Sequence, residues 1–327
     1  MTTAPPKPVD AKPPVPAAAP ERIKAKQRPG DVIFSTSTVI AGGLILAILA
    51  LVALFLIVQS IPAFVADPAE IKGSPSSFWA YVAPLVGGTI WAAFLALLMA
   101  VPVAIGIALF ISHYAPRRLA AGLGYVVDLL AAVPSVVFGL WGITVLAPFV
   151  QPFYSTVVDI FGWIPILAGP VSGTGRTILT VAIVLAVMIL PIITALSREV
   201  FLQTPRLHEE AALALGATRW EMIQMAVLPF GRPGIISASM LGLGRALGET
   251  MAVAMVLSVS GGFSFDLLKS TNPSTIAANI ALNFPEAHGV GVNVLIASGL
   301  ILFVITLIVN SIARYIINRR KAFSGAN

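Results

Sequence analysis

The sequence predicts an all-α polytopic membrane protein with six transmembrane helices, and three observations lead to this fold class. Of its 327 residues 57% are hydrophobic and only 10% are charged, and the mean hydropathy is +0.94. A soluble globular domain carries about a quarter charged residues, so the composition excludes that class. Apolar runs long enough to cross the roughly 30 Å hydrocarbon core occur six times. They are Val39 to Ile61, Leu85 to Ile111, Leu123 to Val150, Ile178 to Leu196, Ile235 to Val259 and Val292 to Ile317.

The third observation is the distribution of basic residues, which sets the orientation. Of the 20 Lys and Arg residues, 16 fall in the N-terminal tail, in the loops after the second and fourth runs, and at the C-terminus. The alternate loops hold only Lys72, Arg176 and Lys269. The positive-inside rule therefore predicts that both termini lie on the cytoplasmic side of the membrane. Topology also explains the pI near 9.8, so we expect membrane lipid, and no nucleic acid, as a partner.

The first apolar run follows a tail rich in proline, alanine and lysine, which we expect to be extended over residues 1–34. The tail is too long for a cleaved signal peptide, and the 23 uncharged residues of the run exceed a usual signal core. We therefore expect the first helix to be a retained anchor. The six helices then form one permease domain over residues 35–321, followed by a short cytoplasmic end at 322–327.

A charged helical hairpin is expected between the fourth and fifth runs, over residues 204–230. Thr204 can cap a helix that starts at Pro205, and Gly216 can supply the left-handed turn that ends it. Thr218 and Glu221 have the spacing of a capping box for a second helix, which Pro229 is expected to close. The prediction is a helix, a glycine elbow and a second helix.

Arg245 and Glu249 lie in the fifth apolar run, where an Arg at the membrane centre costs about 2.5 to 3.5 kcal/mol. At four residues apart they are expected to share one helical face. One hypothesis is that they neutralise each other as a structural pair, with Gly244 and Gly248 admitting a neighbouring helix. The hypothesis we favour places both on a substrate pathway, together with Thr250 and Ser135.

The chemistry of that pair favours an anionic substrate. A guanidinium presents a fixed fork of donors that matches a tetrahedral oxyanion. A glutamate accepts hydrogen bonds, so Glu249 could receive one from the P–OH group of hydrogen phosphate, which sulfate lacks. Phosphate is therefore favoured over sulfate, unless Glu249 is committed wholly to Arg245.

Pro134 interrupts the third apolar run and is expected to kink its helix. The kink would free the carbonyl of Leu130, which Ser135 or water could satisfy. Asp128 is expected to be an interfacial charge near the cytoplasmic end of that helix.

Other kinds of site are not indicated. The chain has no cysteine, which removes disulfide and thiol chemistry, and its three histidines are scattered along the sequence. We therefore expect no metal site. The sequence also lacks a spacing typical of a nucleophile with its base, so we expect no catalytic residue.

The hairpin resembles the EAA loop of the membrane subunits of bacterial ABC importers. The pattern is carried by Glu210, Ala211, Ala212, Gly216, Leu228 and Pro229. It departs from the family at Ala226, where the family has Ile. The resemblance implies a type I ABC importer transmembrane-domain fold, and a hairpin that docks on a cytoplasmic ATPase and transmits its closure to the membrane helices.

Two further segments, Gly244 to Val253 and Ala132 to Gly139, are similar to signature segments of the phosphate-specific transport (Pst) permeases. The long tail, the long first outer loop and the Asn310 to Arg314 ending are more similar to the PstC type than to PstA. The resemblance covers roughly residues 35 to 320. It implies half of a translocation pathway for inorganic phosphate, formed as a heterodimer with a PstA-like permease.

The same resemblance implies the remaining partners. These are a PstB-like ATPase dimer that binds ATP and Mg, and an extracytoplasmic PstS-like phosphate-binding protein, so this chain itself is expected to hold no cofactor. Three alternatives stay open: a permease for another oxyanion such as molybdate or sulfate, a secondary transporter that works without ATP, and a membrane enzyme. The ATPase-docking hairpin argues against the secondary transporter, and the missing catalytic constellation argues against the enzyme.

Overall fold

The computed structural model describes residues 28–73, 75–260 and 262–321. Most of the expected tail, residues 1–27, and the expected end at 322–327 lie outside the described residues. The chain divides into two compact units, Met1–Val52 and Ala53–Asn327. Helix α1 (Pro29–Phe64) begins inside the segment that we expected to be tail and crosses the boundary between the units. In the first unit its apolar side chains are exposed, as suits a helix surrounded by lipid.

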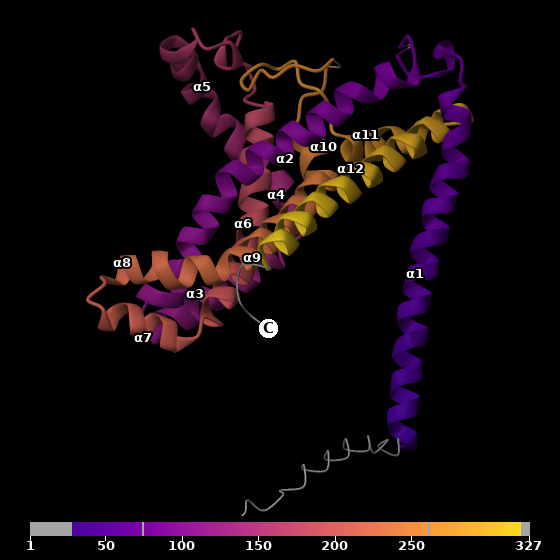
Figure 1. Ribbon diagram of the computed structural model, residues 1–327. Helices are drawn as coiled ribbons and strands as arrows, with labels where there is room; N and C mark the ends of the chain where they lie inside the picture. The colour runs from indigo at the N-terminus through magenta and orange to yellow at the C-terminus, as the bar shows by residue number, and fades with distance from the viewer. Residues whose placement is uncertain (1–27, 74, 261, 322–327) are drawn as a thin grey trace, which may run out of the picture. The chain divides into compact units, whose positions relative to one another are not determined.

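The second unit is built almost entirely from helices, which Figure 1 shows in chain order. After α1 the order is η1 (Pro68–Glu70), α2 (Phe78–Leu109), η2 (Phe110–Tyr114), α3 (Arg117–Ala131), α4 (Ser135–Trp141), η3 (Gly142–Leu146), α5 (Ala147–Phe161), η4 (Pro165–Leu167), α6 (Ile178–Leu202), α7 (Arg206–Ala214), α8 (Arg219–Met222), η5 (Ile223–Val227), α9 (Leu228–Leu247), α10 (Met251–Val256), α11 (Ile276–Asn283), η6 (Phe284–Glu286) and α12 (Val290–Lys321).

Six helices of the described residues are long and apolar enough to span a membrane, which confirms the predicted number. They are Pro29–Phe64, Phe78–Tyr114, Ser135–Phe161, Ile178–Leu202, Arg219–Leu247 and Val290–Ile317. The π-helical segments η2, η3 and η5 lie inside or at the end of three of these spans and do not interrupt them.

Helix α6 forms the centre of the second unit and packs against both α2 and α9. The face of α2 that contributes to the core is a stripe of alanines: Ala92, Ala93, Ala96, Ala100 and Ala104. Facing it, α6 contributes large side chains such as Leu185, Met188 and Ile189, which are almost completely buried. Small residues on one helix let the other approach closely, which is the usual way that helices associate in lipid.

The third span begins later than the sequence predicted. We expected one kinked helix from Leu123 to Val150, but the chain leaves helical geometry at Ala132–Pro134 and the membrane span starts at Ser135. Pro134 has no N–H to donate and disfavours helical geometry in the residue before it, so it ends a helix here instead of bending one. The carbonyl of Leu130 accepts from the N–H of Val133 at 3.3 Å, so it does not depend on Ser135.

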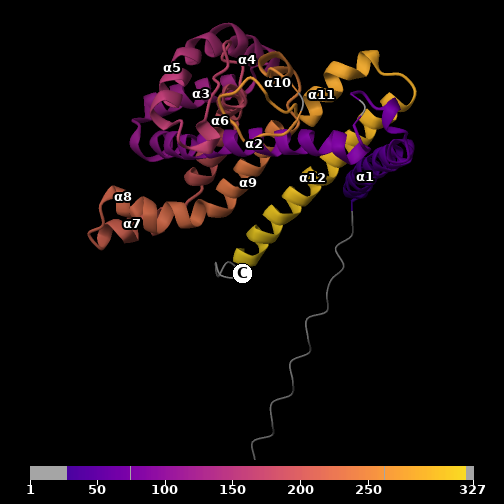
Figure 2. The ribbon, with the colours of Figure 1, turned by 90° about the horizontal axis from the view of Figure 1, so that it is seen from above.

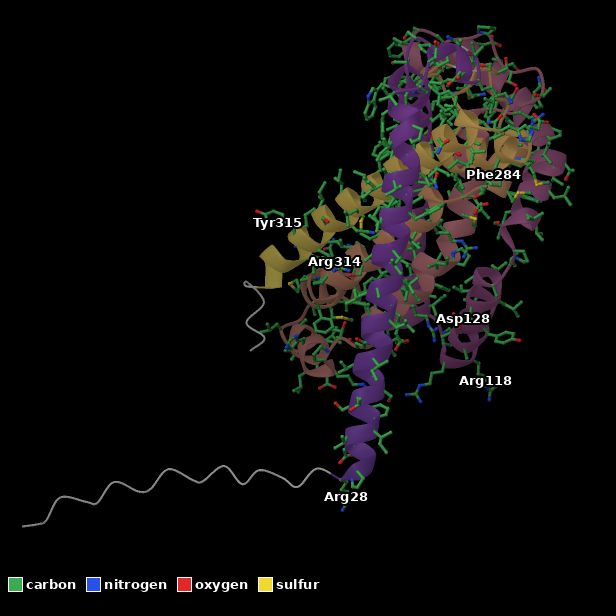
Figure 3. The ribbon with its side chains drawn as sticks, turned by 90° about the vertical axis from the view of Figure 1, so that its right-hand side faces the viewer. Arg28, Arg118, Asp128, Phe284, Arg314 and Tyr315 are labelled. Carbon is green, nitrogen blue, oxygen red and sulfur yellow. The ribbon has the colours of Figure 1, made fainter. Side chains whose placement is uncertain are left out.

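The residues before the break form α3, which is a separate helix. Asp128 is exposed on α3, together with Arg118 nearer its start (Figure 3). We expected Asp128 near the end of the third transmembrane helix, but it lies on α3, before that span begins. The largely apolar composition on both sides of Pro134 concealed the division into two helices.

The fifth span is also divided, and the sequence did not predict this. We expected one helix from Ile235 to Val259, but the span runs from Arg219 to Leu247 and is followed by a short break and then by α10. The break covers Gly248, Glu249 and Thr250. Glycine lowers helix propensity and allows the chain to leave helical geometry at Gly248.

The second unit has two opposite ends. Figure 1 shows α5 and the loop after α10 at one end, and α3, α7 and α8 at the other. Figure 2 shows the same unit from above, with α7 and α8 projecting to one side of α2. Helix α12 ends nearer to the end that carries α7 and α8 (Figure 1). The hairpin and the described C-terminal residues therefore lie on the same side of this unit.

Candidate functional site

The hairpin between the fourth and fifth spans has the predicted glycine elbow. Gly216 adopts a φ of +88°, and its N–H donates to the carbonyl of Leu213. The Thr218 side chain accepts from the N–H of Glu221 at 3.3 Å, and the Glu221 carboxylate accepts from the N–H of Thr218 at 2.7 Å. The helix, elbow and capping box are therefore confirmed.

Two details of the hairpin prediction were wrong. Pro205 itself occupies the N-cap of α7, and the Thr204 hydroxyl is buried with no hydrogen-bond partner among the described residues. Pro229 does not close the second helix, because α8 continues through η5 into α9. Pro229 lies in the first turn of α9, where a proline is tolerated, so the helix passes through it unbroken.

The inner face of the hairpin is packed on the transmembrane helices. Ala212 of the EAA pattern is buried in a cluster with Ile223 and Val227, and this cluster includes Ala108 of α2 and Phe201 of α6. Val227 is completely buried next to Ala226, the position where the EAA pattern has Ile. The hydrophobic anchor that the pattern requires is therefore supplied by the neighbouring residue.

A polar contact joins the hairpin to the end of the second span. His113 Nε2 of η2 lies 3.5 Å from Glu209 Oε1 of α7, and the His113 side chain is only 9% exposed. His113 Nδ1 lies 2.7 Å from the Ser112 hydroxyl, which fixes the ring from its other side. The contact orients α7 relative to α2.

The outer face of the hairpin is exposed and is strongly apolar for a surface. Glu210, Ala211, Gly216 and Pro229 are exposed, and Leu228 is half-buried. The exposed apolar side chains around them are Leu207, Leu213, Leu215 and Trp220, and Leu215 is 89% exposed. An apolar patch that surrounds a carboxylate, carried on a packed hairpin, is typical of a protein-docking surface.

Arg245 lies at the far end of the helix that starts in the hairpin. The span Arg219–Leu247 joins the two without a break, and Arg245 is in its last turn. Arg245 lines a groove of about 580 Å³ formed mainly between α9 and α12. The hairpin and Arg245 are therefore joined by one continuous helix.

Arg245 and Glu249 do not form the structural pair of the alternative hypothesis, and the expectation that they share one helical face is wrong. The helix ends at Leu247, so the two residues do not share a helical face, and the described residues show no ion pair between them. Glu249 is instead buried, and its Oε1 accepts from the N–H of Ala252 at 3.1 Å, in the first turn of α10. A carboxylate at this position satisfies a free N–H group of the helix and complements its dipole.

Ser135 and Thr250 are brought toward the same region by the packing of α4 against α10. A carbon added at Gly139 would lie 2.8 Å from Cα of Ala252, and one added at Gly142 would lie 2.8 Å from Val256. Because residue numbers rise together along the contact, the two helices run in parallel and begin at the same end. Ser135 at the start of α4 and Thr250 at the start of α10 therefore lie at one level.

Arg176 holds the other end of α10 and was missed by the sequence analysis. Its Nε donates to the carbonyl of Val256 at 3.2 Å, and its Nη2 donates to those of Met255 and Leu257 at 3.1 and 3.3 Å. A cation there satisfies the free carbonyls of a helix C-terminus. The short helix α10 is thus capped by a carboxylate at one end and a guanidinium at the other.

Comparison with known proteins decides the family. Residues 100–322 match the family model described as binding-protein-dependent transport system inner membrane component. A Mycobacterium tuberculosis protein named phosphate transport system permease protein PstC 2 is 44% identical, over 92% of this chain and 97% of its own length. A Mycobacterium leprae permease named PstC is 51% identical, over 70% of this chain and 72% of its own length. A Mesorhizobium japonicum permease named PstC is 41% identical, over 90% of this chain and 92% of its own length.

The chain belongs to the PstC family of ABC importer permeases. Solved structures agree in fold with this PstC-family chain. A chain of the MetNI methionine ABC transporter in an inward-facing conformation matches with a TM-score of 0.50 and 16% identity, covering 73% of this chain and 94% of that one. A chain of a bacterial ABC transporter involved in the import of alginate matches with a TM-score of 0.53 and 18% identity, covering 72% of this chain and 79% of that one. The predicted ABC importer transmembrane fold is confirmed.

The contacts around the candidate site that the sequence did not reveal in this PstC-family chain join residues far apart in the sequence. Arg176 caps carbonyls about eighty residues further along the chain, and His113 contacts Glu209 from another span. No local spacing signals such contacts. Asn310 and Arg314, four residues apart on α12, line the groove with Arg245, and only their shared helical face could have suggested this.

Proposed function

We propose that this chain is the permease subunit that forms half of the translocation pathway for inorganic phosphate in an ATP-driven importer. Arg245 carries the proposal. It is a fixed positive charge at the end of a transmembrane helix, it lines an open groove, and it has no ion-pair partner among the described residues. A charge this costly in a membrane is kept for a counter-charge that arrives from outside the chain, and its fork of donors suits a tetrahedral oxyanion.

The names of the relatives support phosphate over molybdate or sulfate. Each of the three relatives described above is named a phosphate transport system permease. Ser135, Glu249 and Thr250 are proposed to lie on the pathway with Arg245. The second oxygen of Glu249 has no hydrogen-bond partner among the described residues, so it remains able to accept from the P–OH group of hydrogen phosphate.

The hairpin is proposed to couple this pathway to ATP hydrolysis. Its exposed apolar patch around Glu210 suits a groove on an ATPase, and its buried face is fixed to α2 and α6. The unbroken helix from Arg219 to Leu247 then transmits the movement of the hairpin to Arg245. ATP and Mg belong to the partner ATPase in this scheme, and this chain contributes no catalytic residue.

The proposed assembly has a PstA-like permease as the second half of the pathway, a PstB-like ATPase dimer at the hairpin, and a PstS-like binding protein on the opposite side. The segment 204–230 is the coupling region within a permease domain of residues 35–321. Both termini and the hairpin are proposed to be cytoplasmic, in a bacterial plasma membrane, which agrees with the bias of the basic residues.

The test is uptake of radiolabelled phosphate into proteoliposomes that contain the full complex, ATP and the binding protein. Arg245→Gln keeps hydrogen bonding but removes the charge, so uptake should fall at least tenfold while the complex still assembles. Arg232→Gln is the matched control, because Arg232 is exposed on the same helix and does not line the groove. Unchanged uptake in Arg245→Gln would remove Arg245 from the pathway. If the unmodified complex took up sulfate or molybdate in preference to phosphate, that oxyanion and not phosphate would be the substrate.

A further inference from the structure

The groove that contains Arg245 holds a second arginine. Arg314 of α12 lines it together with Asn310, one helical turn earlier, while Ser237 and Gly244 line it from α9. The remaining lining residues are Ile192, Met240, Leu241, Ala313 and Ile317. The groove therefore has two guanidinium groups and two neutral polar side chains against an apolar background, and no carboxylate of the described residues lines it. Figure 3 shows Arg314 toward the C-terminal end of α12.

Nothing in the described chain neutralises these charges. Neither arginine takes part in the two ion pairs found among the described residues. Neither arginine side chain makes a hydrogen bond to another described residue. Two cations on one groove repel each other, and apolar surroundings strengthen that repulsion relative to water. A bound anion removes the repulsion and gains charge-assisted hydrogen bonds from both arginines.

The shape of the groove leaves room for such an anion. A carbon added at Gly244 would meet nothing within 4 Å outside its own helix, so the wall beside Arg245 is open. The Asn310 amide and the Ser237 hydroxyl can each donate one further hydrogen bond. The Ser237 hydroxyl donates at 2.9 Å to the carbonyl of Pro233, and it can turn toward a ligand at small cost.

We propose that Arg245 and Arg314, with Asn310, form a two-arginine binding site for a phosphate group in the groove between α9 and α12. Two sources supply that chemistry: inorganic phosphate on its way out of the pathway, or the phosphate headgroup of a membrane lipid. The first source rests on the function proposed above, and the second does not. Arg314 is then a second binding residue, distinct from the four residues already placed on the pathway.

The experiment uses the complete importer complex in nanodiscs. One set contains phosphatidylcholine alone, and the other also contains phosphatidylglycerol. Equilibrium binding of radiolabelled inorganic phosphate is measured in the first set, and retention of phosphatidylglycerol is measured in the second by native mass spectrometry. Arg314→Gln is compared with Arg314→Lys, which keeps the charge but loses the two-pronged geometry, and with the control Arg232→Gln.

If the site binds inorganic phosphate, Arg314→Gln weakens its binding about tenfold or more, the loss expected for a charge-assisted hydrogen bond. Arg314→Lys should then fall between Arg314→Gln and the unmodified complex, and Arg232→Gln should bind normally. If the site holds a lipid, Arg314→Gln leaves phosphate binding intact but loses phosphatidylglycerol. Normal binding of both inorganic phosphate and phosphatidylglycerol by an assembled Arg314→Gln complex would overturn the proposal.

The result also separates this inference from the proposed function. Loss of uptake in Arg245→Gln with normal phosphate and lipid binding in Arg314→Gln removes the two-arginine site and leaves the importer function standing. Absence of phosphate uptake in the unmodified complex removes the importer function. Loss of phosphatidylglycerol in Arg314→Gln would then still support the site.

Discussion

Gly216 is required for its backbone conformation, a φ of +88°, and not for lack of space. A side-chain carbon placed there would meet nothing within 4 Å. Gly216→Val is therefore expected to destabilise the elbow by about 1 to 2 kcal/mol through conformation alone. Misalignment of α7 and α8 should lower phosphate uptake and transport-stimulated ATP hydrolysis together, while membrane insertion persists. Both rates are measurable in the same proteoliposomes.

Gly216→Asn is the matched control, because asparagine tolerates the left-handed region better than valine. It should retain most of the activity that Gly216→Val loses. Equal loss in both variants would assign the effect to the side chain and not to the turn. Normal coupled transport in a Gly216→Val and Glu210→Arg double variant would remove the coupling role of the hairpin.

Arg245 and Glu249 should not be interchangeable, because the structure gives them unrelated partners. In the swap that combines Arg245→Glu with Glu249→Arg, the groove loses a guanidinium and the first turn of α10 loses its capping carboxylate. Loss of such a cap typically costs about 1 kcal/mol, and the buried position of Glu249 adds the cost of an unpaired cation. We expect phosphate uptake to collapse and the melting temperature of the complex to fall. Full uptake with normal assembly would restore the structural-pair hypothesis.

At the scale of elements, sequence patterns predicted helices well and predicted their interruptions badly. The six spans and the hairpin follow from apolar length and from short-range capping, which operate within a few residues. The breaks at Pro134 and at Gly248 lie inside stretches that are apolar enough overall to be taken as single spans, so composition alone does not show them. A proline and a glycine fit a kink as well as a break, and the contacts that hold α10 in place, with α4 and with Arg176, come from distant parts of the chain. The groove of Arg245 was not predicted for the same reason, because Asn310 and Arg314, which line it with Arg245, lie on α12.

The contact between His113 and Glu209 joins two elements, and it can be tested separately from folding. His113→Ala removes the contact between η2 and α7 but leaves the apolar cluster of Ala212, Ile223 and Val227 in place. We expect the complex to assemble and to hydrolyse ATP with several-fold lower phosphate uptake per ATP, because the hairpin moves less strictly with α2. The ratio of the two rates is the measurement.

His208→Ala is the control for that variant, because His208 is exposed on the same helix α7. Its ratio of phosphate transported to ATP hydrolysed should stay unchanged. An unchanged ratio in His113→Ala as well would show that the apolar cluster alone transmits the movement.

For the whole molecule, the membrane orientation remains a prediction that rests on the distribution of Lys and Arg. The structure adds that the hairpin and the end of α12 lie on one side of the second unit, as the six-span topology requires (Figure 1). The loop before α11 lies at the opposite end, and its Asn272 is completely buried and bonded to the carbonyls of Arg176, Ser258 and Lys269. That loop is therefore a firmly held part of the outer side in the proposed orientation.

The chain contains no cysteine, so single cysteines report topology without background. We expect Lys24→Cys and Lys321→Cys to be protected from a membrane-impermeant thiol reagent in intact cells and to react once the cells are permeabilised. Lys269→Cys should react in intact cells. Ser270→Cys is a second outer position, chosen because Ser270 is exposed whereas Lys269 is half-buried and pairs with Asp266 at 3.0 Å. Strong labelling at position 321 from outside would contradict a cytoplasmic C-terminus. Together with protection at 269 and 270, it would invert the orientation and move the hairpin away from any cytoplasmic ATPase.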